Sequence, residues 1–182
     1  MTYSIKSILL GALALILLIP STYGQVERKR VNSWNAAMKD PESVTILDLS
    51  MRSLNELSTD IGLFVNLVRL DLTNNRITRL PAEIGNLKHL ETLDISFNKV
   101  TSLPPEIGKC TNLRNINASF NGLTALPPEI GTLVHMDAIN LSFNKISDLP
   151  PEIGNLTDLR ILTVRLNPLS SLPKEFIKLE KL

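Results

Sequence analysis

The stretch from Leu90 to Asn112, LETLDISFNKVTSLPPEIGKCTN, is one copy of a unit that recurs along most of the chain. Six copies of this 23-residue unit follow one another without insertion or deletion, starting at Val44, Leu67, Leu90, Leu113, Met136 and Leu159. A fixed period of this length means that each copy is one structural unit, whose apolar side is buried only by stacking on its neighbours. The repeat therefore decides the fold and favours a protein that presents a surface.

Each unit predicts the same sequence of local structures. Leu90, Leu93 and Ile95 alternate as in a short, half-buried strand. The dipeptide Pro104-Pro105 ends any sheet after that strand. The Glu-Ile-Gly that follows is typical of about one helical turn, with an acid near its start and a glycine where the chain reverses. One unit is thus a strand, a turn, a short convex segment and a return.

One asparagine recurs just after each predicted strand. An amide side chain both donates and accepts hydrogen bonds, so it can satisfy the backbone groups that the turn points inward. We therefore predict a structural ladder of buried, mutually satisfied amides, made of Asn75, Asn98, Asn121, Asn144 and Asn167. Arg52 takes this position in the first copy, where one side of the ladder borders solvent.

The pattern L-x-x-L-x-[LIV]-x-x-N-x-[LIV]-x-x-L-P-x-E-I-G-x-L over residues 44–182 resembles the leucine-rich repeat family. Its 23-residue LPxEIG form resembles the class shared by bacterial secreted leucine-rich repeat proteins and by Ras-linked leucine-rich repeat scaffolds of plants and animals. The resemblance implies an α/β fold, a right-handed, curved leucine-rich repeat solenoid with a parallel concave sheet and short helical or 3-10 convex turns. It implies no particular chemistry.

Residues 1–24 are typical of a secretory signal peptide. Lys6 precedes an uncharged apolar run from Ile8 to Ile19, and small residues follow Pro20. The run is shorter than the ~20 apolar residues of a membrane span, which favours cleavage over the alternative of an uncleaved anchor. We therefore expect a secreted, periplasmic or cell-surface protein with no membrane insertion after signal cleavage.

Residues 25–43 are predicted to form an N-terminal cap helix. Val31, Trp34 and Met38 are spaced for one helical face, and Pro41 marks its end. A cap would cover the apolar end of the first unit, as solenoids require. The alternative is a partner-binding helix anchored by the tryptophan.

The other end of the repeat region is less regular. Phe176, Leu179 and Leu182 fall on one helical face surrounded by charged residues. This pattern fits either a frayed C-terminal cap or an apolar edge that pairs with another chain. We predict weak self-association through this end.

The net charge of the chain limits the class of partner. Removal of residues 1–24 removes only the charge of Lys6, which leaves 18 basic and 18 acidic residues. A neutral chain has no long-range attraction for nucleic acid or anionic membranes, so neither is an expected partner.

Cys110 is the only cysteine, so no internal disulfide can form. It replaces the leucine of other copies, which predicts a buried small residue, with a redox-active or intermolecular thiol as the alternative.

Outward-pointing residues at equivalent positions of successive strands should line up in columns across the concave face. Neighbouring strands in such a sheet are about 4.8 Å apart. One column runs through Asp48, Asp71, Asp94, Asn117, Asn140 and Thr163, and a second through Ser50, Thr73, Ser96, Ser119, Ser142 and Arg165. Arg69 belongs to a neighbouring outward column. Its guanidinium and the three Asp carboxylates are candidate ligand-binding groups, the acids selecting a basic edge of the ligand. The alternative is that these charges only balance one another.

An aromatic stripe is the feature most typical of a binding patch. Phe97, Phe120 and Phe143 occupy the same position in three successive copies. Rigid aromatic side chains bury a large area at a small entropic cost, so we predict that these three contact the ligand on the concave face. The alternative is that phenylalanine is inherited with the repeated Ser-Phe-Asn and packs against the turn.

Catalysis, metal binding and a cofactor are not predicted. His89 and His135 take the same position two copies apart, about 10 Å by strand spacing, too far to share a metal. The sequence has no HExxH, paired-cysteine or glycine-rich phosphate motif. Three glycosylation sequons begin at Asn117, Asn140 and Asn155, and sugars on the first two would block part of the concave face.

These patterns predict a secreted, non-enzymatic protein-binding module that holds its ligand on the concave sheet. One alternative is a self-assembling structural or adhesive surface protein. Another is a membrane-tethered signalling scaffold with an uncleaved N-terminal anchor. The ligand itself does not follow from the pattern, because a repeat family keeps its scaffold and varies its surface columns.

Overall fold

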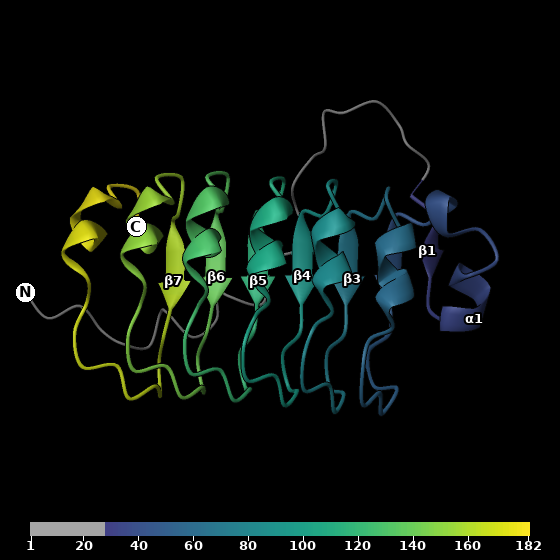
Figure 1. The fold of residues 1–182 in the computed structure, drawn as a ribbon, viewed down its shortest axis with the longest axis horizontal. Coiled ribbons are helices and arrows are strands. Elements are labelled where there is room, and N and C mark those ends of the chain that lie inside the picture. The colour runs from purple at the N-terminus through teal and green to yellow at the C-terminus, as the bar shows by residue number, and fades with distance from the viewer. Residues whose placement is uncertain (1–27) are drawn as a thin grey trace, which may run out of the picture.

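Seven parallel strands lie side by side in chain order along one face of the coil stack (Figure 1). The computed structural model describes residues 28–182, so the predicted signal peptide lies outside the described residues. The strands are β1 (Arg30–Val31), β2 (Ile46–Asp48), β3 (Arg69–Asp71), β4 (Thr92–Asp94), β5 (Asn115–Asn117), β6 (Ala138–Asn140) and β7 (Ile161–Thr163). From β2 onward each residue pairs with the one 23 positions later, as Ile46 does with Arg69. The predicted parallel-sheet solenoid is confirmed.

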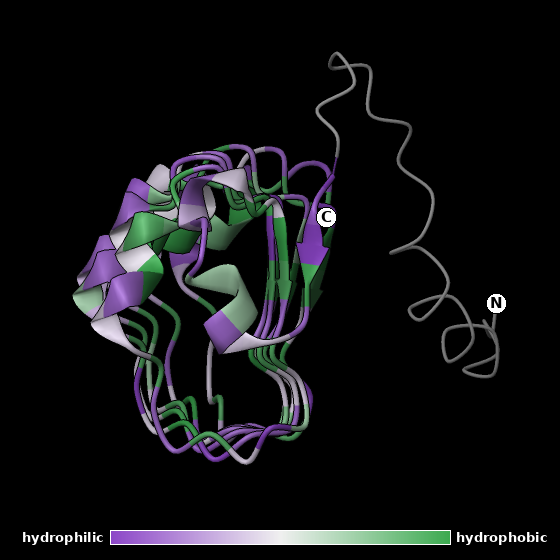
Figure 2. Ribbon diagram, turned by 90° about the vertical axis from the view of Figure 1, so that its right-hand side faces the viewer, coloured by the Kyte–Doolittle hydropathy of each residue, from purple (hydrophilic) through white to green (hydrophobic). Residues whose placement is uncertain are grey.

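Short 3-10 turns form the side opposite the sheet (Figure 2). They are η4 (Thr59–Leu63), η5 (Ala82–Asn86), η6 (Pro105–Lys109), η7 (Pro128–Thr132), η8 (Pro151–Asn155) and η9 (Lys174–Lys178), and the segment before β2 holds α1 (Trp34–Ala37) and η3 (Pro41–Ser43). In η6, the N–H of Ile107 donates to the carbonyl of Pro104 at 3.0 Å, an i to i+3 bond. Proline suits the start of such a turn, because a first-turn N–H would lack a partner in the turn.

The N-terminal cap differs from the single helix predicted over residues 25–43. Its helix α1 has only four residues, and β1 adds a strand to the sheet instead. The ring of Trp34 packs against Phe64, with centroids 5.5 Å apart. Val31, Trp34 and Met38 all pack against the core, so the segment covers the apolar end of the first coil.

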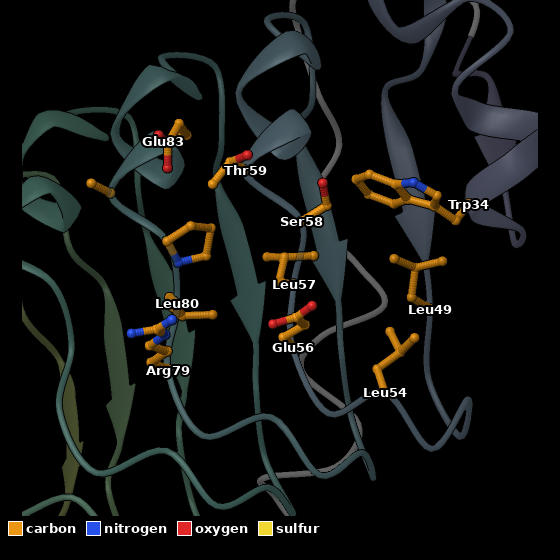
Figure 3. Close-up of a pocket in the computed structure, with 12 residues that line it drawn as sticks. Trp34, Leu49, Leu54, Glu56, Leu57, Ser58, Thr59, Arg79, Leu80 and Glu83 are labelled. Atoms are coloured by element: carbon orange, nitrogen blue, oxygen red, sulfur yellow. The ribbon is translucent and has the colours of Figure 1, made fainter.

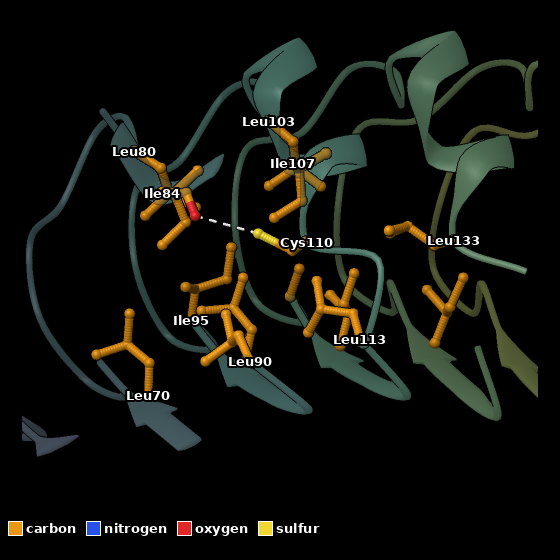
Figure 4. Packing of buried hydrophobic residues seen from close by; sticks show 14 of the residues in the cluster. Leu70, Leu80, Ile84, Leu90, Ile95, Leu103, Ile107, Cys110, Leu113 and Leu133 are labelled. Atoms are coloured by element: carbon orange, nitrogen blue, oxygen red, sulfur yellow. Dashed lines mark hydrogen bonds between the residues drawn. The ribbon is translucent and has the colours of Figure 1, made fainter. Parts of the chain in front are cut away.

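Equivalent leucine and isoleucine side chains stack inward into one continuous core (Figure 4). The central residues of β2 to β6 are at most 3% exposed, namely Leu47, Leu70, Leu93, Ile116 and Ile139. Cys110 lies in this core, where its Sγ donates to the carbonyl of Ile84 at 3.1 Å. Burial raises the pKa of this thiol to about 11. Cys110 is therefore a packing residue as predicted, since a reactive thiol needs exposure and a lowered pKa.

The asparagine ladder joins neighbouring coils through the backbone. Nδ2 of Asn98 donates to the carbonyl of Leu72 in the preceding coil at 2.9 Å and to that of Ile95 in its own coil at 3.0 Å. Its Oδ1 accepts from the N–H of Ile77 at 3.0 Å. The same pattern recurs at Asn75, Asn121, Asn144 and Asn167. The amides therefore satisfy inward backbone groups as we predicted, but those of two coils, and they do not bond to one another. Asn75 and Asn144 are buried, whereas the other three are half-buried.

Asn98→Ala tests the ladder. The substitution leaves the buried N–H of Ile77 without a partner and opens a small void, so the free energy of unfolding should fall by about 2 kcal/mol in a denaturant titration. Asn115→Ala is the matched control. The Asn115 side chain is half-exposed on β5 and makes no hydrogen bond among the described residues, so its loss should cost less than about 0.5 kcal/mol. Equal losses in the two variants would contradict the role given to the ladder.

A row of glycines sets how closely the convex turns approach one another. A Cβ on Gly108 would lie 2.6 Å from the carbonyl oxygen of Glu129 in the next turn. The corresponding distances are 2.7, 2.6 and 2.4 Å for Gly85, Gly131 and Gly154. No glycine among residues 28–182 has a positive φ, so these positions are not chain reversals of the left-handed type that the sequence suggested. Glycine is needed here because only a residue without a side chain fits between the turns.

Gly108→Ala should push two convex turns apart. We expect the free energy of unfolding to drop by about 1–3 kcal/mol, because the clash is with backbone that cannot rotate away. Gly122→Ala provides the control, since a Cβ there would meet its nearest atoms at 3.6 Å, an ordinary contact. That variant should be unchanged or up to about 1 kcal/mol more stable, because alanine restricts the unfolded chain. A stable Gly108→Ala protein would refute the close-approach argument.

Candidate functional site

From β2 to β6, each strand directs its first and third residues to the concave surface and its second into the core. In β7 the second residue is half-buried. The third residues form the predicted acidic column, and all are half-exposed: Asp48, Asp71, Asp94, Asn117, Asn140 and Thr163. Arg69 is the first residue of β3 and lies between Ile46 and Thr92 of the neighbouring strands. The serine column predicted to face outward is buried in its central part, where Ser96, Ser119 and Ser142 are 2%, 5% and 7% exposed.

The serines are held by the polar side chain two residues before them. Oδ1 of Asp94 accepts from the N–H of Ser96 at 2.9 Å and from its hydroxyl at 2.6 Å. The same two bonds join Ser50 to Asp48 and Ser119 to Asn117, and the backbone N–H bond alone joins Thr73 to Asp71 and Ser142 to Asn140. This bond ends each strand locally. Its signal in the sequence is the recurrence of Asp or Asn two residues before Ser or Thr in five copies.

Asp48 is also engaged from the N-terminal side. Arg30 of β1 approaches its Oδ2 to 2.6 Å. Burial works against the charged form, but the hydrogen bond from Ser50 and the guanidinium of Arg30 outweigh it, so the pKa of Asp48 lies below its ordinary value. The carboxylate therefore stays charged and occupied by groups of the protein itself.

The other two acids of the column have partners as well. Nδ2 of Asn117 donates to Oδ2 of Asp94 at 3.0 Å, across neighbouring strands. The guanidinium of Arg69 stands 3.8 Å from Oδ2 of Asp71 on the same strand. Contacts within the protein thus account for the acidic column without a ligand.

Three stacked rings form a ridge beside the concave sheet, in the turn just after β4, β5 and β6. We call Phe97, Phe120 and Phe143 the Phe ridge. Successive ring centroids are 4.3 and 4.0 Å apart with interplanar angles of 9° and 13°. Between 39% and 50% of each side chain remains exposed. Met51 and Leu166, at the same position in the first and last coils, are 74% and 66% exposed.

The backbone of the ridge is unusual for phenylalanine. Every coil has a positive φ at this position, between 54° and 58°, in Met51, Asn74, Phe97, Phe120, Phe143 and Leu166. The left-handed region costs a residue with a side chain roughly 1–2 kcal/mol, and asparagine tolerates it best. Asn74 shows that the turn accepts that better-suited residue. The backbone of the turn therefore does not require phenylalanine at this position.

A cavity of about 670 Å³ lies between the N-terminal cap and the first two coils (Figure 3). Its lining is partly apolar, with Trp34, Leu49, Leu54, Leu57 and Leu80, and partly charged, with Glu56, Arg79 and Glu83. Ser58, which also lines it, accepts a hydrogen bond from the N–H of Asp60 as the N-cap of η4. No histidine or cysteine lies in the lining, so the cavity lacks the usual base beside a hydroxyl nucleophile.

His89 and His135 are both exposed and lie two coils apart. Across residues 28–182, no three His, Cys, Asp or Glu side chains gather as metal ligands. Nδ1 of His135 faces Oδ2 of Asp158 at 3.7 Å, in a surface cluster that includes Lys181. In this same part of the chain, none of the helices has the length and hydrophobicity of a membrane span.

A family model described as a leucine-rich repeat region matches residues 32–143, and a model for a single leucine-rich repeat matches residues 135–156. The chain belongs to the leucine-rich repeat family. The resemblance of the repeated units is thereby confirmed at the level of the family. No curated protein shows significant similarity to this leucine-rich repeat chain.

Solved leucine-rich repeat structures share the fold. A leucine-rich repeat protein of Leptospira interrogans is 40% identical with a TM-score of 0.79, over 85% of this chain and 39% of that one. The ectodomain of the receptor kinase GASSHO1/SCHENGEN3 from Arabidopsis thaliana is 32% identical with a TM-score of 0.70, over 78% and 18%. The plant peptide hormone receptor RGFR1 is 31% identical with a TM-score of 0.71, over 87% and 26%. The chain thus spans well under half the length of each.

Proposed function

We propose that this leucine-rich repeat chain is a secreted or cell-surface, non-enzymatic module that binds a protein ligand on the concave side of its solenoid. The Phe ridge carries the proposal, because its three rings are exposed, stacked and held at left-handed positions that suit them poorly. Exposed apolar patches on soluble proteins mark contact sites. Aromatic anchors of this kind dominate the energetics of many protein interfaces.

Two similar structures support a peptide or protein ligand. The GASSHO1/SCHENGEN3 ectodomain was solved in complex with CASPARIAN STRIP INTEGRITY FACTOR 2, and the peptide hormone receptor RGFR1 in complex with RGF2. The first of these is the ectodomain of a membrane receptor kinase. Together with the signal peptide predicted over residues 1–24, this favours a location outside the cytoplasm.

The proposed site is centred on the Phe ridge. The sheet beside it is about 25–30 Å wide by strand spacing, enough for a loop or helix of a partner. Asp48, Asp71, Asp94 and Arg69 line that sheet, but their bonds within the protein already explain them. The ridge is the part of the surface that the fold itself does not require.

Replacement of all three ridge residues by asparagine tests the proposal. The purified protein is crosslinked to partners in extracts and surrounding fluid of its source, and the retained protein is identified and titrated. We expect the Phe97→Asn/Phe120→Asn/Phe143→Asn variant to bind that partner at least tenfold more weakly. Its melting temperature should change by only a few degrees, because relief of the left-handed strain offsets the lost stacking.

The matched control removes exposed apolar side chains elsewhere. Val65 and Val134 follow convex turns and are 41% and 44% exposed, so a Val65→Asn/Val134→Asn variant should keep its partner. A partner retained by the ridge variant as well as by this control would contradict the proposed site.

Self-assembly is a second candidate function, and the last coil favours it. β7 is one of the two edge strands of the sheet among the described residues, the other being β1. Ile161, Leu166, Leu172 and Ile177 of this coil are 46–86% exposed. The open edge of such a strand, beside exposed apolar side chains, is a surface on which a second chain can pair.

Sedimentation from micromolar to millimolar protein measures this tendency. If the last coil pairs, the mean mass should rise with concentration, and Ile161→Ser/Ile177→Ser should keep it at the monomer value. A monomer mass throughout that range for the unchanged protein would rule out assembly through this end.

A further inference from the structure

A basic row follows the Phe ridge along the solenoid. Arg76, Lys99 and Lys145 each come directly after a ladder asparagine, and all three are exposed. None of the ion pairs or side-chain hydrogen bonds among residues 28–182 involves them. Their charges are thus available to a partner. Gly122 takes the equivalent position in the coil of Phe120.

The basic row lies beside the ridge. Lys99 is two residues after Phe97, and the Asn98 between them turns inward to bond the backbone of two coils. Because the middle residue points into the core, its two exposed neighbours both lie on the outer surface of the turn. The same order holds for Phe143, Asn144 and Lys145. The two outer rings of the ridge therefore each have a lysine on the same side, and Arg76 continues the row in the coil before Phe97.

The other side of the ridge does not cancel this charge. Arg30 and Arg69 offset the charges of Asp48 and Asp71, while Asp94 is bonded to the neutral Ser96 and Asn117 and keeps its negative charge. Three residues beyond the basic row, the loops carry Glu56, Arg79 and Asp148, which together add one negative charge. The three positive charges of the basic row therefore outnumber the unbalanced negative charges next to the ridge.

The stacking selects the kind of group that can contact the rings. The stacking at 4.0–4.3 Å covers both faces of Phe120 and one face each of Phe97 and Phe143, so the ridge presents mainly ring edges to solvent. Cations bind the negative face of an aromatic ring, and sugars also stack on faces. Ring edges carry the positive end of the quadrupole, which favours aliphatic groups, aromatic faces and oxygen atoms.

We propose that the Phe ridge and the basic row together bind an extended acidic segment of the partner protein, and this inference rests on the proposed function. Apolar side chains of the segment contact the ring edges, and its Asp or Glu carboxylates reach Arg76, Lys99 and Lys145. Apolar residues two apart on an extended chain lie about 7 Å from each other, which fits the length of a three-ring stack. The selected charge is the opposite of the basic edge that the Asp column had suggested.

A random peptide library displayed on phage tests the chemistry of the site. Selection on the full chain should enrich peptides that carry Asp or Glu beside Leu, Ile, Phe or Tyr. One enriched peptide is then synthesised and titrated by fluorescence anisotropy. An Arg76→Ser/Lys99→Ser/Lys145→Ser variant should bind it about tenfold more weakly at low salt, and the difference should shrink at high salt.

Two comparison variants make the outcomes distinguishable. Lys39→Ser/Lys109→Ser/Lys178→Ser changes the net charge equally, but at exposed positions on the cap and the convex turns, and should bind like the unchanged chain. Equal binding by the basic-row variant, or enrichment of basic or uncharged peptides, overturns the acidic ligand while the ridge site stands. Binding that survives Phe97→Asn/Phe120→Asn/Phe143→Asn overturns the proposed function, and a selection without binders overturns both.

Discussion

Hydrogen bonds from asparagine amides to shared backbone carbonyls are the constraint on which the rest of the structure depends. The carbonyl of Leu72 accepts from Asn75 of its own coil and from Asn98 of the next, and the carbonyl of Ile95 accepts from Asn98 and Asn121 in the same way. Each coil is thereby bonded to the one before it at a fixed offset. The 23-residue register, the parallel pairing and the alignment of surface positions all follow from that offset.

Much of the fold could be predicted from the sequence, because apolar residues at one fixed period can be buried together in only one way. The parallel sheet, the inward leucines and the burial of Cys110 are of this kind. β1 could not be predicted, since a two-residue strand has no periodic pattern and exists through its pairing with β2. The need for glycine at the position of Gly108 could not be predicted either, because it depends on the close approach of Glu129 in the neighbouring turn.

The candidate site could likewise be predicted only in part from the sequence. The Phe residues were found as a repeated exposed position, but their left-handed backbone and ring stacking emerge only when coils are placed side by side. Asp94 was read as a surface acid because its spacing places it on the concave face, which is correct. Spacing alone does not show that Ser96 and Asn117 already occupy its oxygens. Equivalent residues in one column can therefore stabilise the turn, form a binding surface, or do both.

The stacking of the three rings also affects the entropic cost of binding a partner. Phe120 has a nearly parallel ring on each side at 4.0–4.3 Å, and both neighbours restrict the rotation of its ring. The order that most interface side chains acquire only on association is present here in the free protein. A partner would meet a rigid surface and lose little affinity to freezing it. The middle ring keeps the other two in place, so the ridge behaves as one body.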